Sequence, residues 1–426
     1  MDNQAIIAII VFLLSYALII SEKIHRTIIA ISGAVLMIGL GIINQSTAIH
    51  HIDFNTLGLL IGMMILVYVT SETGAFRYVA IWSAKKVKGD PLKILIAFAL
   101  ITAVASAFLD NVTTVLLMVP ITFTITRQLK VNPFPYLITE ILVSNIGGTA
   151  TMIGDPPNIM IGSAVPELTF GAFINNLALI SGIILLVTLP ILAFIYRKQL
   201  RTTKELRESL MELNEKEAIT DYKLLIKSVS VLILTIIGLF LGHFLHMDSA
   251  TIALAGAFLL LLLSGEHHLE RALENVEWTT IFFFVGLFVL VGGLVETGVI
   301  ETLATQAIVF TEGDLTKTSM LILWMSAIAS SFVDNIPFVA TMIPLIKEMG
   351  ELGITYLEPL WWGLALGACL GGNGTLIGAS ANLIVAGLAE KEEEHISFVK
   401  FMLIGFPIMI LSVLISSIYI YLRYLI

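Results

Sequence analysis

Long apolar segments with few or no charged residues follow one another along most of the chain. A helix needs roughly 20 apolar residues to cross a bilayer core about 30 Å thick, and the 57% apolar residues and mean hydropathy of +0.96 leave room for many such helices. The sequence therefore predicts an all-α integral membrane protein. Ten full spans are predicted, at about 5–21, 27–43, 56–71, 136–170, 176–196, 229–246, 250–264, 280–295, 360–388 and 401–421.

The two halves of the sequence repeat each other at a constant offset of 224 residues. Three pairs of blocks match: 53–74 with 277–298 (7 identities in 22), 106–120 with 330–344 (7 in 15), and 144–158 with 368–382 (6 in 15). The matches align DN with DN, GG with GG and ETG with ETG, which favours duplication of one ancestral unit. We predict a first repeat at 1–196, a charged, solvated cytoplasmic linker at 197–227 and a second repeat at 228–426.

Two shorter apolar arms lie between the third and fourth spans of each half. The arms are 92–109 with 112–126, and 318–333 with 336–346. An Asp-Asn dipeptide lies between the two arms of each pair. We interpret each pair as a re-entrant hairpin, which leaves five full spans in each half. If the arms instead cross the membrane fully, each half has seven spans. Either number is odd, so the second repeat is predicted to be inverted relative to the first.

The distribution of positive charge predicts the orientation in the membrane. With the N-terminus outside, all lysines and arginines fall on the cytoplasmic side except Lys317, Lys347 and Arg423, as the positive-inside rule expects. Both termini are therefore predicted to be extracytoplasmic, in a bacterial inner (plasma) membrane. The first four residues carry no positive charge before the apolar run, so no cleavable signal peptide is expected.

Composition and motifs exclude several classes of protein. The net charge of −9 and the absence of a basic block remove the electrostatic grounds for a nucleic-acid partner. A single cysteine, Cys369, excludes an internal disulfide and multi-cysteine metal sites, and is interpreted as a small packing residue. No phosphate-binding loop or HExxH motif occurs. We predict a membrane transporter, not an enzyme, with no cofactor beyond a coupling ion.

Ionisable residues at membrane depth are few, and such residues usually mark a site. They are Asp110 and Asp334 at the two hairpin tips and Asp155 in the interrupted fourth span. No lysine or arginine occurs within these core segments, so the core is expected to be acidic only. Nearby polar side chains add Asn111, Thr113, Thr114, Asn145, Thr149, Thr151 and Asn158 in the first repeat, and Asn335, Asn373, Thr375, Ser380 and Asn382 in the second.

Glycines at matching positions predict that the fourth span of each repeat is broken. They are Gly147, Gly148 and Gly154 in the first repeat, and Gly371, Gly372 and Gly378 in the second. A broken helix frees backbone carbonyls, which bind cations, and helix N-termini, which attract anions. Helix packing is the alternative role for any single glycine.

These residues predict two cation sites that flank a substrate cavity. Asp110 and Asn111, with backbone from 147–154, are expected to form one Na⁺ or H⁺ site, and Asp334 and Asn335, with backbone from 371–378, the other. A buried carboxylate can also titrate near neutral pH, so proton coupling is physically available. Five residues are expected to line the cavity between the two sites: Thr151, Asp155, Asn158, Thr375 and Asn382.

Four segments give the chain a family resemblance. SAFLDNVTTVLLMVP, NIGGTATMIGDPPN, SSFVDNIPFVATMIP and GACLGGNGTLIGASAN resemble the pigmentation P protein family, within the ion transporter superfamily that includes ArsB arsenite permeases, NhaD sodium/proton antiporters and divalent-anion/sodium symporters. The resemblance implies two inverted repeats with re-entrant hairpins and broken helices, a homodimer, and a transport domain that moves as an elevator. The sodium-coupled anion members carry Ser-Asn-Thr at the tips, where this chain has Asp-Asn-Val and Asp-Asn-Ile.

The functional hypothesis is a secondary active transporter that couples Na⁺ or H⁺ to a small ion or anionic solute. The alternatives are a Na⁺/H⁺ antiporter without an organic substrate, an arsenite-type efflux permease, and a passive anion channel. A membrane subunit driven by a separately encoded ATPase also stays open.

Overall fold

The computed structural model describes residues 3–21, 23–265 and 267–426, and within these ranges every regular element is helical. Eight of the described helical segments are long and apolar enough to cross a membrane: 3–21, 54–72, 91–109, 111–129, 170–196, 222–245, 278–296 and 398–425. Large apolar side chains on the outer surfaces of these helices are exposed, for example Leu186, Phe244 and Leu403, which suits contact with lipid. The predicted all-α membrane fold is confirmed.

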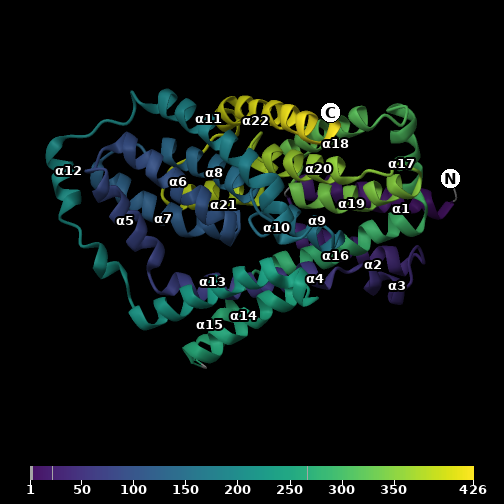
Figure 1. Cartoon of the computed structure of the whole chain (residues 1–426), viewed down its shortest axis with the longest axis horizontal. Coiled ribbons are helices and arrows are strands. Elements are labelled where there is room, and N and C mark those ends of the chain that lie inside the picture. The colour runs from purple at the N-terminus through teal and green to yellow at the C-terminus, as the bar shows by residue number, and fades with distance from the viewer. Residues whose placement is uncertain (1–2, 22, 266) are drawn as a thin grey trace.

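The helices form two layers, which we call the lower layer and the upper layer as they appear in Figure 1. The lower layer contains α1 (Asn3–Ser21), α2 (Arg26–Gly39), α3 (Gln45–His51), α4 (Phe54–Glu72), α13 (Tyr222–Leu245), α14 (Ser249–Ser264), α15 (His267–Glu274) and α16 (Trp278–Glu296). It is built from the first three spans of both repeats: α2 packs on α16, and α14 packs on α4. α1 overlaps the upper layer in the view of Figure 1 and is assigned to the lower layer because it packs on α2 and α16.

The upper layer holds the hairpins and the broken helices. It contains α6 (Pro91–Leu109), α7 (Asn111–Leu129), α8 (Phe134–Gly148), α9 (Pro156–Ala164), α10 (Phe170–Phe173), α11 (Leu179–Tyr196), α18 (Leu315–Phe332), α19 (Asn335–Glu351), α20 (Glu358–Gly371), α21 (Ser380–Lys391) and α22 (Phe398–Ile420). A π-helical turn, Ile174–Ala178, joins α10 to α11, and another, Tyr421–Leu425, follows α22.

The hairpins α6–α7 and α18–α19 enter from opposite ends of the molecule (Figure 1). Their tips lie close together: Asp110, Asn111 and Asn335 line one cavity, and Asp334 lines a neighbouring one. Each hairpin thus turns back inside the molecule, which favours the re-entrant interpretation over seven full spans per repeat. Both ends of the chain lie in the half of the molecule away from α12 (Figure 1), as expected for two inverted repeats with odd numbers of spans.

Short helices connect the layers at positions that the apolar spans did not predict. α5 (Ala75–Lys86) follows α4 and leads into the first hairpin, and α17 (Val299–Phe310) does the same in the second repeat. Each begins directly after a glycine with a left-handed backbone, Gly74 with φ 77° and Gly298 with φ 71°. This conformation is easily adopted only by residues without a β-carbon, so the repeated Glu-Thr-Gly sequence marks the turn into the connecting helix.

The predicted linker is not entirely solvated. It contains α12 (Lys204–Met211) and a 3₁₀ turn, Glu215–Ala218, and α13 begins at Tyr222, inside the range predicted as linker. Leu200, Leu210 and Ala218 are buried, and α12 packs against α7.

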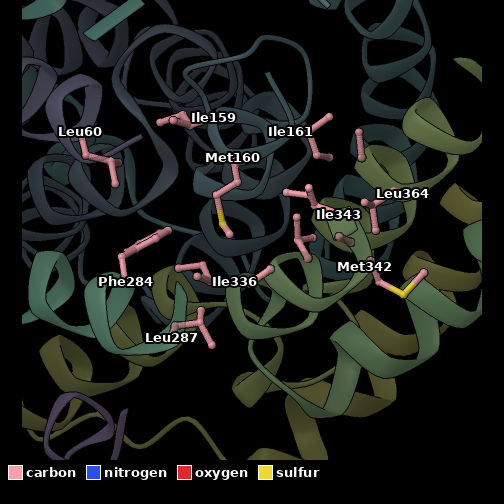
Figure 2. Packing of buried hydrophobic residues seen from close by; sticks show 14 of the residues in the cluster. Leu60, Ile159, Met160, Ile161, Phe284, Leu287, Ile336, Met342, Ile343 and Leu364 are labelled. Atoms are coloured by element: carbon pink, nitrogen blue, oxygen red, sulfur yellow. The ribbon is translucent and has the colours of Figure 1, made fainter. Parts of the chain in front are cut away.

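α9 and α19 pack on each other within the upper layer, and α4 and α16 of the lower layer pack against them. Figure 2 shows Ile159, Met160 and Ile161 of α9 close to Ile336 and Ile343 of α19. Leu60 of α4, with Phe284 and Leu287 of α16, belongs to the same buried cluster. α9 belongs to the first repeat and α19 to the second, so each repeat's broken helix contacts the other repeat's hairpin; α21 packs on α7 in the same way.

Candidate functional site

Asp110 forms the tip of the first hairpin and caps α7. Its carboxylate accepts hydrogen bonds from Thr113 N (2.8 Å) and Thr113 Oγ1 (2.7 Å), and Thr114 Oγ1 donates to the Asp110 carbonyl (2.7 Å). The Asp110 backbone has φ 75°, which is uncommon for a residue with a β-carbon. The turn therefore holds the carboxylate against the start of its own helix.

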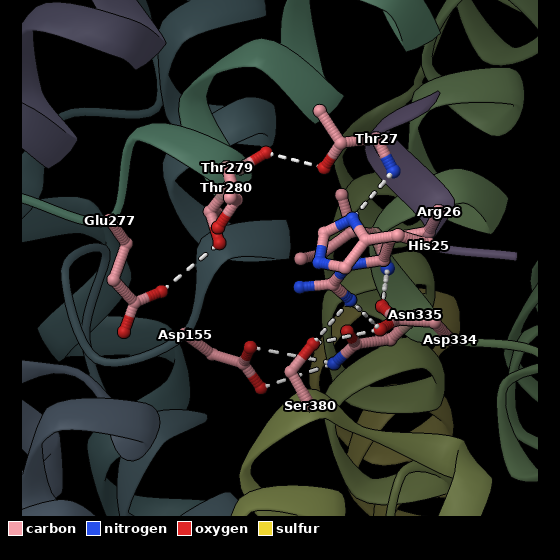
Figure 3. Close-up of polar contacts among 11 residues, drawn as sticks. His25, Arg26, Thr27, Asp155, Glu277, Thr279, Thr280, Asp334, Asn335 and Ser380 are labelled. Atoms are coloured by element: carbon pink, nitrogen blue, oxygen red, sulfur yellow. Dashed lines mark hydrogen bonds and ion pairs between the residues drawn. The ribbon is translucent and has the colours of Figure 1, made fainter. Parts of the chain in front are cut away.

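Asp334 at the second tip has a different set of partners (Figure 3). Its Oδ1 accepts from Ile336 N (3.0 Å), and its Oδ2 accepts from Ser380 Oγ (2.8 Å) and from Arg26 Nη1 (2.7 Å). Arg26 Nη1 also donates to Ser380 Oγ (2.7 Å). The two tips are thus equivalent in sequence and different in chemistry.

The helix breaks are held by equivalent asparagines. Asn158 Nδ2 donates to the carbonyls of Thr149 (3.2 Å) and Thr151 (2.9 Å), and Asn382 Nδ2 donates to those of Gly372 (2.7 Å) and Thr375 (3.0 Å). These bonds satisfy carbonyls that the interrupted helices leave without intrahelical partners. The side chains of Thr151 and Thr375 donate to the carbonyls of Ala107 and Ser331, which fixes each break against the neighbouring hairpin.

The glycines at the breaks allow close helix contacts. A β-carbon at Gly147 would collide with the Ala103 carbonyl of α6, and one at Gly371 would collide with the Ala327 carbonyl of α18. Gly154 and Gly378 similarly face the carbonyls of Gly148 and Gly372. These glycines are required for the close approach of α8 to α6 and of α20 to α18. They therefore serve helix packing, the alternative role considered for them from the sequence.

A buried amide network joins the repeats beneath the tips. Asn145 Nδ2 donates to Asn373 Oδ1 (2.9 Å) and to Asn382 Oδ1 (3.0 Å), while Asn145 Oδ1 accepts from Asn111 Nδ2 (3.0 Å). Asn373 Nδ2 completes the network through the Leu142 carbonyl (3.1 Å). All of these side chains are almost fully buried, so the network fixes the first tip relative to both broken helices.

A small cavity of about 40 Å³ lies between the layers, next to the two tips. Its wall includes Asp110, Asn111, Thr113, Asp155, Asn335 and Ser380 among the predicted site residues. Asn335 Nδ2 lies 3.4 Å from both carboxylate oxygens of Asp155 (Figure 3). Because Asp155 belongs to the first repeat and Asn335 to the second, the cavity is formed by both repeats.

The remaining predicted residues take structural positions in this state. Thr151, Asn158, Thr375 and Asn382, expected to line the substrate cavity with Asp155, instead use their polar atoms within the breaks and the amide network. Thr149 Oγ1 donates to the Asn145 carbonyl (2.7 Å). Asp334 lines a neighbouring cavity of about 240 Å³, together with Arg26 and Ser380.

Sequence reasoning missed two charged residues. The core is not acidic only, because Arg26 reaches Asp334 from the start of α2, a position that the sequence placed at the cytoplasmic end of a span. Glu140 of α8 is also buried, with Thr122 Oγ1 as a hydrogen-bond donor. Glu140 could have been identified from the sequence, because it lies within a predicted apolar span. Nothing in the sequence indicated where the Arg26 side chain points.

The site is chemically suited to a small cation. Carboxylate, amide and hydroxyl oxygens are the ligands that hard cations prefer. A cavity needs about 10–15 Å³ to hold one water molecule, so 40 Å³ accommodates a monatomic ion with little accompanying water. The larger cavity beside Asp334 has room for a small organic solute, and Arg26 and Ser380 lie between the two spaces.

Comparisons with known proteins identify the chain as a membrane transporter. The family model described as CitMHS, citrate transporter, matches residues 16–367. The chain is 41% identical over 428 residues to an uncharacterized transporter of Mycobacterium bovis, with 99% of each chain covered. It is also 36% identical over 501 residues to the human P protein, covering 98% of this chain and 60% of the P protein, which confirms the predicted resemblance.

A solved structure shares the fold. The YdaH transporter of Alcanivorax borkumensis, whose structure is described as having an unusual topology, superposes with a TM-score of 0.61 over 99% of this chain and 98% of its own. Sequence identity is 12%, so this likeness supports the architecture alone.

Proposed function

Since the chain belongs to the CitMHS citrate transporter family, we propose that this integral membrane transporter works by secondary active transport, coupling Na⁺ or H⁺ to the movement of a small anionic solute. The observation that carries the proposal is the meeting of Asp110, Asp155 and Asn335 at one small cavity between the layers. Carboxylates at membrane depth are costly and generally serve ions or protons.

An elevator-type movement of the upper layer fits the distribution of site residues. Asp110, Asp155, Asp334 and Asn335 all belong to the upper layer, so one rigid movement would carry the whole site. The lower layer would act as the scaffold and would also form the contact of a homodimer. The cavity beside Asp334 adjoins the loop between α1 and α2, which the charge distribution places in the cytoplasm. With that predicted orientation, the cavity beside Asp334 would open toward the cytoplasm in this state.

A carboxylate solute is the proposed class of substrate. The name of the matching family supports it, and the 240 Å³ cavity next to Arg26 offers both space and a positive charge. In the described structure no lysine or arginine pairs with Asp110 or Asp155, so these carboxylates would repel an anion unless a cation neutralises them. Binding of the coupling cation before the anion follows from this repulsion. No cofactor is proposed beyond the coupling ion.

A Na⁺/H⁺ exchanger without an organic substrate is the second candidate. The observation that favours it is the 40 Å³ volume between the tips, which suits a monatomic ion and not a tricarboxylate. The same acidic cluster would serve both functions, so flux measurements must separate them.

The test is purified protein in proteoliposomes that contain a pH-sensitive dye. Na⁺, Li⁺ and K⁺ gradients are imposed in turn, with and without labelled citrate, and the Asp110→Asn and Asp334→Asn variants are compared with wild type. Cation-dependent citrate uptake that both substitutions abolish supports the symporter. Na⁺-driven proton movement without citrate dependence supports the exchanger. Wild-type flux in both variants would remove the tips from the mechanism.

A further inference from the structure

Arg26 connects the two layers through a single side chain. It begins α2 in the lower layer, and its guanidinium carbon lies 4.8 Å from the ring centroid of Phe283 in α16, also in the lower layer. Its Nη1 atom donates to Asp334 and Ser380, which both belong to the upper layer (Figure 3). Among the described residues, this is the one Lys or Arg ion pair that joins the layers.

The ion pair has no counterpart in the first half-site. The position equivalent to Arg26 in the second repeat is Ala250, and the position equivalent to Ser380 in the first repeat is Pro156. In the described structure no lysine or arginine forms an ion pair with Asp110, which is capped by Thr113 instead. The two half-sites therefore differ in charge: the second tip has an arginine and a serine as partners, and the first tip has neither.

The location of the ion pair makes it sensitive to relative movement of the layers. The side chains of Arg26 and Asp334 are 26% and 9% exposed, so neither charge is fully hydrated in this state. Sliding the upper layer away from α2 would break the pair and leave a poorly hydrated carboxylate, which is unfavourable. A cation that replaces the guanidinium at Asp334 removes this penalty.

We propose that Arg26 is an internal counter-ion that latches the unloaded upper layer to the lower layer, and that Na⁺ releases the latch by displacing the guanidinium from Asp334. The proposal rests on the elevator transport proposed above. Without a bound cation, Asp334 is paired with a residue of the stationary layer, so the empty carrier moves more slowly than it would without Arg26. The role of Arg26 is thus to suppress leak, and Ser380 aligns the pair.

Two measurements test the latch, using Arg26→Gln with Arg26→Lys as the charge-conserving variant. Arg127→Gln is the matched control, because Arg127 pairs with Glu392 within the upper layer. The first measurement is ²²Na⁺ and proton leak into proteoliposomes without an anionic substrate. We expect Arg26→Gln to raise this leak at least several-fold, with Arg26→Lys intermediate and Arg127→Gln at the wild-type level.

The second measurement reports the position of the upper layer without transport. Leu383 lines the cavity beside Asp334 and is 36% exposed, so Leu383→Cys in nanodiscs provides a site for a hydrophilic maleimide; the buried Cys369 of the unmodified chain gives the background. Without Na⁺ and at alkaline pH, labelling should be rapid when Arg26 is present and several-fold slower with Arg26→Gln. Added Na⁺ should slow labelling only when Arg26 is present.

The outcomes separate this proposal from the proposed function. Equal leak and equal labelling in Arg26→Gln and Arg127→Gln overturn the latch, while cation-driven flux in wild type still supports the transporter mechanism. Weaker citrate affinity in Arg26→Gln without added leak also overturns the latch and makes Arg26 a substrate ligand. Changed labelling in Arg26→Gln, together with Na⁺-sensitive labelling but no cation-driven flux in wild type, supports the latch and contradicts the proposed coupled transport.

Discussion

Asn145 and Cys369 occupy equivalent positions in the two repeats, and each donates a hydrogen bond to the asparagine that holds the other repeat's broken helix. Asn145 Nδ2 lies 3.0 Å from Asn382 Oδ1, and Cys369 Sγ lies 3.5 Å from Asn158 Oδ1. The repeats therefore stabilise each other's breaks through the same geometry with two different donors. Cys369, interpreted from the sequence as a packing residue, also makes a polar contact.

The contact of Cys369 gives a stability prediction. Cys369→Ala leaves Asn158 Oδ1 buried without this donor, and leaving a buried polar group unsatisfied costs about 1–3 kcal/mol. A thiol is a weak donor, so we expect a value near the lower end. Cys369→Ser restores a hydroxyl donor and should recover most of the loss. Thermal unfolding in detergent, followed by intrinsic tryptophan fluorescence, measures both; equal melting temperatures for the alanine variant and wild type would contradict the role.

Asp155 gives a functional prediction. It lies within 3.4 Å of Asn335 across the repeat boundary and is 1% exposed. Asp155→Asn keeps the size of the side chain but removes the charge, so the affinity for the coupling cation should fall about tenfold or more, equivalent to about 1.4 kcal/mol. The measurement is the Na⁺ or H⁺ dependence of flux in proteoliposomes. An unchanged half-saturating cation concentration would place the ion elsewhere.

Glycine-to-alanine substitutions should affect stability differently at closely packed and at open positions. Gly147→Ala and Gly371→Ala should each destabilise the protein by about 1–3 kcal/mol or more, because the added methyl groups meet backbone oxygens of α6 and α18. Gly182→Ala and Gly387→Ala are matched controls, since a β-carbon there meets no atom within 4 Å; replacing a helical glycine with alanine at an open position is neutral or favourable by up to about 1 kcal/mol. Melting temperatures of all four variants check the contrast.

Linker docking should depend on pH. Lys85 Nζ donates to Glu215 Oε2 (2.6 Å) and to the Leu213 carbonyl (2.7 Å), and this hydrogen bond from Lys85 lowers the pKa of Glu215 below its ordinary value of 4.5. A carboxylate with a lowered folded-state pKa stabilises the docked linker above the ordinary pKa, and that contribution is lost as pH falls through the lowered value.

Hydrogen exchange over 204–218, corrected for intrinsic rates, measures this dependence. Protection should be constant from about pH 7 down to about pH 5 and should decrease below about pH 4. Lys85→Ala should lower protection at neutral pH and flatten the profile. A profile that stays unchanged in this variant would show that burial of Leu210, not the ion pair, holds the linker.

Much of the architecture was predictable because it is encoded locally. Apolar span length, the offset of 224 between DN tips, and the matching glycines predicted an inverted-repeat helical membrane protein with hairpins and breaks, and these features depend on hydropathy and backbone preferences within short segments. Even the asymmetry between Asp155-Pro156-Pro157 and Ala379-Ser380-Ala381 was visible in the sequence.

The tertiary structure alone decided which groups meet. Asn335 faces Asp155 because the broken helix of one repeat packs on the hairpin of the other, and no local pattern specifies that crossing. Arg26 reaches Asp334 because a long side chain at a helix start extends into a neighbouring layer. Which side chains become partners depends on the packing of the whole molecule. The apolar segments of the sequence therefore determined the helices, and the three-dimensional arrangement of the helices determined which charged groups meet at the candidate site.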